Sequence, residues 1–395
     1  MKWKAIWSHL PIEYGTLLGK VENATQRTVI KNYLNGDRIR LQFSNIFSDE
    51  ELVLEKVMIG IRKSDSNEVC GTVSVTYQGN TKIRIPAGVE FYSDAVPFRV
   101  RTGQEIVVSV YVKDTANVKT VASYWSAQIC HTIYRQGGDY TADILDGVES
   151  CEVYPYVKSD LAGAGVVMGF RSLYVETDND VQTIALFGDS ITHMSYFSDE
   201  LIKKINRKFP GKYAFINRGI GGNRLLRDPF YLESMPNGGS MAGKAGITRF
   251  EKDVYTDEIP EIVLVLEGVN DLMHPHLFGI PNELVDGSEL AAGLQKLIDI
   301  SRKKGSRFYA GTVMPYYSEI CTETRRSESA RYSYNEWICT RAEIDGVMDY
   351  ASALTDESNP LMMKSGTDIG DGLHPNESGG SIMADVVIKT LFGDK

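Results

Sequence analysis

Hydrophobic and polar positions follow two different patterns in the two halves of the chain. Up to about residue 178 the apolar residues form short runs, and in 38–45 and 82–88 they alternate with polar ones, which is typical of half-buried strands. Turn residues separate the runs, and no helical pattern lies between them. The first half therefore predicts an all-β, jelly-roll-like sandwich. The expected strands are 28–34, 38–45, 72–77, 82–88, 105–114 and, after long loops over 134–167, a last strand near 168–176.

In the second half, apolar runs typical of buried strands alternate with helical patterns. In the helix expected over 289–305, the residues Leu290, Leu294, Leu297 and Ile298 recur three and four positions apart, as a core-facing stripe does. Strands that are apolar on both faces and are separated by helices predict a parallel sheet with helices on both sides. The expected strands are 183–188, 213–219, 261–268, 307–313 and 346–350, and the expected helices are 196–209, 289–305, 329–344 and 377–392.

Composition adds limits on domain number and on partners. A chain of 395 residues favours two domains, which we place at 1–178, an accessory β-sandwich, and at 179–395, an α/β catalytic domain. The net charge of -10 argues against a nucleic-acid partner, and no apolar run reaches the ~18–20 residues that a membrane-spanning helix needs. The five cysteines match no metal or redox motif. These features favour a cytoplasmic protein, although a secreted protein trimmed of its signal peptide would have the same N-terminus.

Four loops in the second half carry residues suited to chemistry. Residues 188–190, 217–224 and 267–271 follow expected strands, and 371–380 precedes the last helix. Because functional groups gather at the carboxyl ends of parallel strands, we expect these loops to meet. Each loop also has a purely structural explanation: Ser190 as a helix cap, 217–224 as a glycine turn, 267–271 as a capped turn and 371–380 as a helix entry.

Taken together, the loops supply the parts of a serine nucleophile. A serine hydroxyl needs a base, normally a histidine that a carboxylate orients. Among the six histidines, His374 has Asp371 three residues earlier in a glycine-bearing loop, while Asp368 is a more distant competitor. We therefore predict Ser190 as nucleophile, His374 as base and Asp371 as the orienting carboxylate.

Acyl transfer also needs hydrogen-bond donors for the developing oxyanion. The backbone amide of Ser190 is one candidate. A glycine amide within 219–222 is a second, because glycine allows the closest approach of the backbone, and we choose Gly222. The side-chain amide of Asn270 is the third.

The four motifs, Gly-Asp-Ser, the glycine loop, Gly-x-Asn-Asp and Asp-x-x-His, resemble in this order those of the SGNH (GDSL-type) hydrolase family over residues 180–395. The resemblance implies a flavodoxin-like, three-layer α/β/α fold and no cofactor. It implies that Ser190 is the nucleophile, that Gly222 and Asn270 bind the oxyanion, and that His374 acts with Asp371. The first half also resembles the β-rich domain that precedes this catalytic domain in a group of bacterial esterases.

Several other residues have a functional and a structural interpretation. His193 departs from the residue common in relatives, and it either lines the substrate site or is a partly exposed residue of the first helical turn. The pair His274 and His276 lacks the acidic or cysteine neighbours of a metal site, so we expect substrate contact and no metal. Gly238, Gly243 and Lys244 have the spacing of a phosphate-binding loop, but Ala245 stands where such a loop has a Ser or Thr that binds magnesium. We therefore expect no nucleotide site here. The residues expected to contact substrate are Asp189, His193, Arg224, His274 and His276.

These observations predict a serine esterase that removes short acyl groups, above all O-acetyl groups, from carbohydrates. The expected partner is thus a small-molecule or oligosaccharide ester, not a nucleic acid or a membrane, and a homo-oligomer stays open. One alternative is a lysophospholipase or thioesterase. The other is a carbohydrate-binding protein with an inert hydrolase domain.

Overall fold

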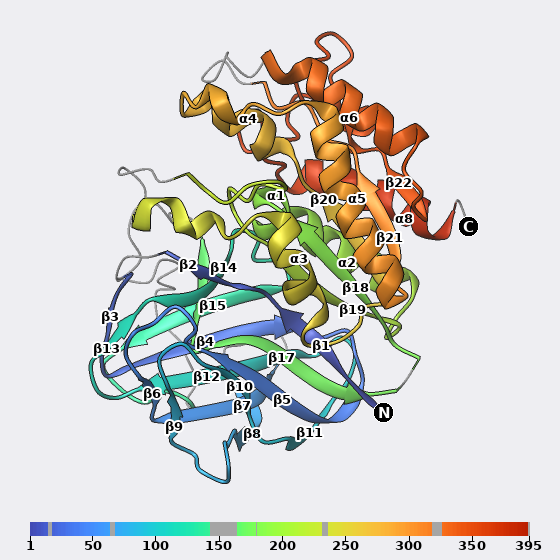
Figure 1. The fold of residues 1–395 in the computed structure, drawn as a ribbon. Helices are drawn as coiled ribbons and strands as arrows, with labels where there is room; N and C mark the ends of the chain where they lie inside the picture. Colours follow the sequence, from blue (N-terminus) through green and yellow to red (C-terminus); the bar gives the residue numbers. More distant parts are fainter. Residues whose placement is uncertain are drawn as a thin grey trace. The chain divides into compact units, whose positions relative to one another are not determined.

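The chain divides into two compact units. The computed structural model describes residues 1–14, 18–63, 68–142, 164–178, 180–230, 236–317 and 326–393. The first unit contains Met1–Val181, with Lys208–Ile216 among its later segments, and the second contains Gln182–Arg207, Asn217–Leu232 and Ala242–Lys395. Figure 1 colours the first unit mainly blue to green and the second mainly green to red.

Two five-stranded antiparallel sheets dominate the first unit. One has the order β1-β17-β5-β10 with β11 also paired to β5, and the other has the order β15-β4-β12-β7-β8. Smaller sheets pair β13 with β3, β14 with β16 and β2, and β6 with β9. The all-β prediction is confirmed. The strands are β1 Lys2–Ser8, β2 Pro11–Glu13, β3 Gly19–Val21, β4 Ala24–Lys31, β5 Gly36–Ser44, β6 Leu52–Leu54, β7 Lys56–Arg62, β8 Val69–Ser74, β9 Ile83–Ile85, β10 Glu90–Tyr92, β11 Val96–Val100, β12 Glu105–Val112, β13 Ala116–Val118, β14 Thr120–Tyr124, β15 Cys130–Gln136, β16 Gly165–Met168 and β17 Phe170–Thr177.

Strand β4 begins earlier than the sequence predicts because polar side chains are buried along it. Residues 25–28 are almost fully buried although none of them is apolar. Gln26 pairs with the backbone of Met168, and the guanidinium of Arg27 donates to the hydroxyl of Ser109 at 3.2 Å. Hydrogen bonding offsets the cost of burying these groups, so a polar stretch forms a core strand.

The long loops expected over 134–167 are shorter than predicted. Strand β15 extends to Gln136 and β16 begins at Gly165, while residues 143–163 lie outside the described part of the chain. Gly169, with φ of +86°, separates β16 from β17.

The second unit is an α/β fold built on a sheet with the order β19-β18-β20-β21-β22. The registers of β18, β20, β21 and β22 are parallel, as the buried apolar runs predict. The strands are β18 Gln182–Gly188, β19 Tyr213–Gly219, β20 Ile262–Leu266, β21 Arg307–Gly311 and β22 Gly346–Met348.

Two groups of helices complete the three layers of this flavodoxin-like fold. Helix α5 contacts both α3 and α6, and α8 contacts α7, α2 and β22. The stripe Leu290, Leu294, Leu297 and Ile298 on α5 is buried, as predicted. The helices are α1 Ser190–His193, α2 Tyr196–Lys208, α3 Gly246–Tyr255, α4 Val269–Leu277, α5 Gly287–Lys304, α6 Glu328–Thr340, α7 Tyr350–Leu354 and α8 Glu377–Phe392, with 3-10 turns η2 Pro236–Ala242 and η3 Pro281–Glu283.

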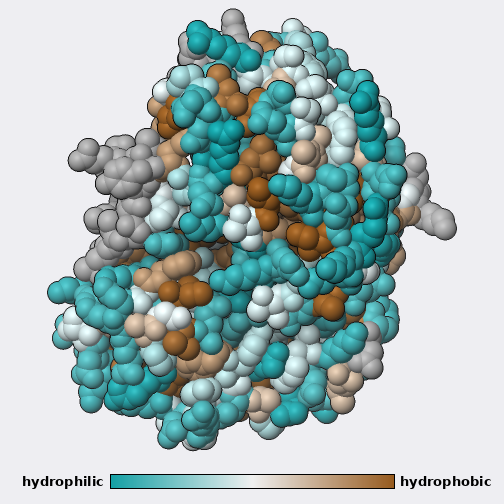
Figure 2. Space-filling model, in the orientation of Figure 1, coloured by the Kyte–Doolittle hydropathy of each residue, from teal (hydrophilic) through white to brown (hydrophobic). Residues whose placement is uncertain are grey.

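Hydrophilic residues predominate on the face drawn in Figure 2, where hydrophobic residues form several separate groups. Within the described ranges, no helix combines the length and the apolar character needed to cross a bilayer.

Candidate active site

Ser190 lies at the sharp junction between β18 and α1. A side chain on Gly188 would place its Cβ only 2.6 Å from the carbonyl oxygen of Leu266, so the strand can end here only with glycine. The Asp189 carboxylate accepts a hydrogen bond from the backbone N–H of Ile191 at 2.9 Å. The capping residue of α1 is therefore Asp189, and the structural alternative that made Ser190 the cap is wrong.

His374 contacts both groups that the sequence assigned to it. Its Nε2 lies 2.8 Å from the hydroxyl oxygen of Ser190, and its Nδ1 lies 2.5 Å from a carboxylate oxygen of Asp371. A carboxylate only accepts, so Nδ1–H donates to Asp371, and Nε2 is left to accept the hydroxyl proton of Ser190. Residues 184 positions apart thus form one hydrogen-bonded chain.

The loop before α8 orients Asp371 independently of the imidazole. The other carboxylate oxygen of Asp371 accepts the backbone N–H groups of Leu373 at 3.0 Å and His374 at 2.9 Å. The competitor Asp368 instead accepts the N–H groups of Gly370 and Gly372 and shapes the turn.

Burial by itself raises the pKa of Asp371, but the hydrogen bonds from His374 outweigh burial and lower this pKa to about 2. Asp371 is therefore a carboxylate at any pH where the imidazole can act as a base.

The glycine loop after β19 and the first turn of α4 are joined by the side chain of Asn270. Its Nδ2 donates to the backbone carbonyl of Asn223 at 2.8 Å. The neighbouring Asp271 accepts the N–H groups of Leu225 at 2.6 Å and Leu226 at 2.9 Å. Two of the four predicted segments are thus held together by side chains of the Asn-Asp pair.

Gly222 and Gly268 occupy backbone conformations that favour glycine, with φ of +75° and +120°. A Cβ on Gly222 would also lie 3.8 Å from the Cε1 atom of His274 and 3.3 Å from the Cβ of Ala242. Glycine at 222 therefore lets the backbone pass close to Ala242 and to His274 on α4.

Three buried carboxyl groups lie beneath the loops. Burial raises the pKa of Asp189 and of Asp271 to about 6. Burial, together with the nearby charge of Asp189, raises the pKa of Glu267 well above its usual value. These groups support the loops, because Asp189 and Asp271 accept backbone N–H groups and Glu267 accepts from Arg249.

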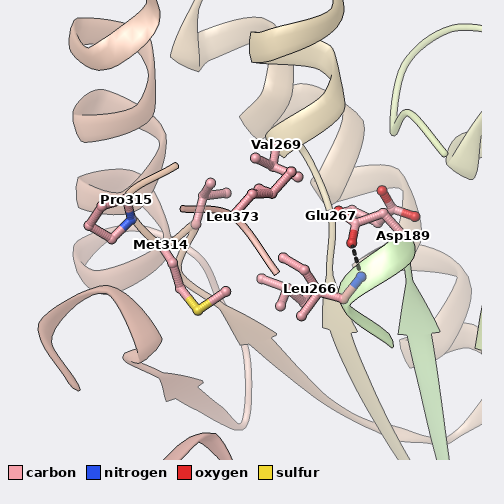
Figure 3. A pocket seen from close by; sticks show the side chains of 9 residues that line it. Asp189, Leu266, Glu267, Val269, Met314, Pro315 and Leu373 are labelled. Atoms are coloured by element: carbon pink, nitrogen blue, oxygen red, sulfur yellow. Dashed lines mark hydrogen bonds between the residues drawn. The ribbon is translucent and has the colours of Figure 1, made fainter. Parts of the chain in front are cut away.

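A small cavity of about 10 Å³ lies next to residues that flank the nucleophile, Asn270 and the base. Figure 3 shows the carboxylates of Asp189 and Glu267 on one side of it, with Met314, Pro315 and Leu373 on another. A volume of this size holds about one water molecule or one methyl group. The lining residues are Asp189, Ile191, Leu266, Glu267, Val269, Val313, Met314, Pro315 and Leu373.

Arg224 has an internal structural role in this structure, and its predicted contact with substrate stays a prediction. Its side chain is only 2% exposed, and Nη1 donates to the carboxylate of Glu283 at 2.6 Å. Its guanidinium also stacks over Phe230, with 3.9 Å between Cζ and the ring centre.

His274 packs in an aromatic cluster with Phe230 and Phe278. Burial, and secondarily the charge of Arg224, lowers the pKa of His274 to about 4, so this imidazole is neutral at pH 7. His276, two residues further along α4, lines a surface pocket of about 450 Å³.

His193 is buried, so the prediction of a partly exposed first-turn residue is wrong. The backbone N–H of Gly221 donates to its Nδ1 at 3.1 Å. A Cβ on Gly219 would come within 2.3 Å of the backbone nitrogen of His193. The imidazole therefore braces the glycine loop against α1.

Sequence reasoning missed three residues that connect these loops: Asn223, Arg249 and Glu267. Arg249 and Glu267 are charged but almost fully buried, and only the fold brings them together. The sequence offered one signal for such a residue: Glu267 is charged although it directly precedes the motif residue Gly268.

No group of three or more His, Cys, Asp or Glu side chains suited to a metal ion occurs among the described residues. Among the described residues, Cys70 and Cys339 are exposed free thiols.

The sequence model of the GDSL-like lipase/acylhydrolase family matches residues 186–381. A search of curated proteins finds no match. Among solved structures, acetylxylan esterase Axe2 from Geobacillus stearothermophilus is 17% identical, with 53% of this chain and 94% of that chain covered and a TM-score of 0.41. The α/β hydrolase LAE5 from the metagenome of Lake Arreo, Spain, is 16% identical, with 54% and 96% covered and a TM-score of 0.42.

Proposed function

Residues 186–381 belong to the GDSL-like lipase/acylhydrolase family, and on this premise we propose that the protein is a serine esterase specific for short acyl groups. The observation that carries the proposal is the hydrogen-bonded chain from Ser190 through His374 to Asp371. Such a chain activates a serine hydroxyl for attack on an ester carbonyl.

In the first step the Ser190 oxygen attacks the carbonyl carbon, and its proton passes to Nε2 of His374. The negative charge moves to the carbonyl oxygen, for which we assign the Ser190 and Gly222 N–H groups and the Asn270 amide as donors, each worth on the order of 3 kcal/mol. Collapse of the tetrahedral intermediate breaks the ester C–O bond, and His374 returns the proton to the leaving alcohol.

In the second step water attacks the acyl-enzyme, and His374 takes a proton from that water. Collapse of the second tetrahedral intermediate releases the carboxylic acid and restores the Ser190 hydroxyl. Asp371 stays ionised throughout and keeps Nδ1 protonated, so that Nε2 remains the basic nitrogen.

The size of the cavity beside Ser190 supports a short acyl group. Its lining is mostly apolar and includes Asp189 and Ile191, the two neighbours of Ser190, and a space of about 10 Å³ favours a small group over a long chain. We therefore propose acetyl esters as substrates. For the alcohol we propose a carbohydrate, because an all-β unit precedes the α/β part of the chain, as in the group of bacterial esterases that the first half resembles.

We further propose a cytoplasmic location. Cys70 and Cys339 are exposed free thiols, a state that a reducing compartment preserves.

The test compares wild type with Ser190→Ala on 4-nitrophenyl esters from acetate to octanoate and on acetylated mono- and oligosaccharides. We expect the highest kcat/KM with acetate and a loss of at least about 10⁴-fold in kcat for Ser190→Ala. A rate that rises with chain length to octanoate would instead indicate a lysophospholipase or thioesterase. Sugar binding without any hydrolysis would indicate an inert carbohydrate-binding protein.

A further inference from the structure

Arg249, on α3, uses every hydrogen-bond donor that its side chain has. A guanidinium carries five N–H groups, and the structure gives five acceptors for them. The side chain is almost fully buried, and its Cζ lies 4.0 Å from the centre of the Phe187 ring. The acceptors are the Asn223 side-chain oxygen at 2.8 Å, the carbonyl oxygens of Arg218 and Gly188, both at 2.9 Å, the Asp253 carboxylate at 3.0 Å and the Glu267 carboxylate at 3.3 Å.

Three of these acceptors belong to three different loops of the candidate site. Gly188 lies two residues before the nucleophile, Asn223 directly follows Gly222, and Glu267 lies three residues before Asn270. One rigid, planar group therefore spans the carboxyl ends of β18, β19 and β20.

The contact with Asn223 extends to the predicted oxyanion donors. The Asn223 side chain accepts from Nε of Arg249, while its own amide donates to the carbonyls of Ala242 at 2.7 Å and Lys244 at 2.8 Å. Its backbone carbonyl in turn accepts from Asn270. Two hydrogen bonds, both to Asn223, thus connect Arg249 with the Asn270 amide. Asn223 is also the residue directly after Gly222.

We propose that Arg249 is a positioning residue that sets the distance between Ser190 and the oxyanion donors of Gly222 and Asn270. The inference rests on the proposed esterase function, and Arg249 itself does not touch the reacting atoms. A lysine cannot replace it, because an ammonium offers three donors from one point and cannot span three loops. The ion pair with Asp253, at 3.0 Å, offsets part of the cost of burying the positive charge.

The test measures kcat and KM on 4-nitrophenyl acetate for Arg249→Lys and Arg249→Ala. Labelling of Ser190 by a fluorophosphonate, which needs the nucleophile and the oxyanion donors but no turnover, gives a second rate. We expect kcat and the labelling rate to fall about 100-fold in both variants, with KM changed less than about threefold. Added methylguanidinium should restore part of kcat in Arg249→Ala and none in Arg249→Lys.

Arg171→Ala is the matched control. Arg171 is a buried arginine of the first unit whose Nε donates to Glu90 at 3.0 Å. This variant should lose thermal stability, keep its kcat and show no response to methylguanidinium. If neither Arg249 variant folds, Asn223→Ala removes the contact with Nε while keeping the backbone carbonyl, and kcat should fall with KM unchanged.

This inference alone would be overturned if a folded Arg249 variant kept the wild-type kcat and labelling rate. The same holds for Asn223→Ala if neither Arg249 variant folds. An equal fall of kcat in Arg171→Ala would also overturn it, because the effect would then reflect the loss of any buried arginine. Wild-type protein that neither hydrolyses acetate nor labels would overturn the proposed function and this inference with it.

Discussion

At the scale of single residues, burial gives Asp189 properties that its place in a turn motif does not reveal. The carboxyl group is fully buried, with one oxygen on the N–H of Ile191 and the other without a protein partner in the structure. Burial raises its pKa from 3.8 to about 6. Between these two pH values the folded protein therefore holds a proton that the unfolded chain releases.

The expected consequence is that the contribution of Asp189 to the free energy of unfolding decreases as pH rises from about 4 to about 6. Asp189→Asn keeps an acceptor for Ile191 but no longer titrates, so across this interval the wild type should lose up to roughly 3 kcal/mol relative to the variant. Urea unfolding of both proteins across this pH interval measures the difference. Asp286→Asn, at the exposed cap of α5, is the control of opposite sign: hydrogen bonds from Ser288 and Glu289 lower the pKa of Asp286, so its removal should not make the decrease smaller. Parallel pH curves for wild type and Asp189→Asn would contradict the argument.

Gly222 offers a second test at this scale, because Gly305 shares its backbone conformation without its surroundings. Their φ angles are +75° and +81°, but a Cβ on Gly305 would meet nothing within 4 Å. Alanine at either position should cost roughly 1–2 kcal/mol of stability through backbone strain. Only Gly222→Ala, next to His274, should also lose kcat on 4-nitrophenyl acetate. Equal kcat in the two variants would remove Gly222 from the oxyanion site.

At the scale of elements, α5 shows how much one helix depends on local sequence. Asp286 and Glu289 form a capping box at its start, Gly305 ends it with a positive φ, and its apolar stripe faces the core. Each of these signals lies within the helix or directly next to it. The boundaries of α5 are therefore predictable within about two residues.

Leu294→Ala tests the packing of this stripe. The side chain is 1% exposed, so its truncation should lower the free energy of unfolding by about 2–5 kcal/mol. Lys296→Ala, on the exposed face of the same helix, should change it by no more than about 0.5 kcal/mol. Chemical denaturation followed by circular dichroism measures both. A similar, small cost for the two variants would mean that α5 contributes little to the core.

At the scale of the whole molecule, the predicted catalytic residues and oxyanion donors all belong to the second unit. Three roles are open for the first unit: to form one wall of the site, to mediate assembly, or to cover the catalytic domain. A core substitution confined to the first unit separates the first of these roles from the others.

Ile106→Ala provides that test, because Ile106 is fully buried on β12, between β4 and β7. The cavity should lower the stability of the first unit by about 2–5 kcal/mol. With the site carried by the second unit, kcat measured well below the melting temperature should stay at the wild-type value. A matching loss of kcat would show that the first unit shapes the site.

The sequence by itself determined the parts of this protein whose signals are local. Hydrophobic periodicity predicted β18, β19 and α8 nearly residue for residue, and motif order predicted the chain from Ser190 through His374 to Asp371. It failed for β4, where buried polar side chains pair across the sheet, and for α3 and α4, to which no helical prediction was assigned.

Only the tertiary structure decided what the polar residues around the motifs do. The ion pair of Arg224 depends on the position of Glu283, 59 residues away, which the sequence does not reveal. His193 and Arg249 are buried because distant loops converge on them. The hydrophobic effect acts on each short segment and therefore leaves a pattern in the sequence. A hydrogen bond between remote side chains depends on where the fold places its partner, and it leaves no such pattern.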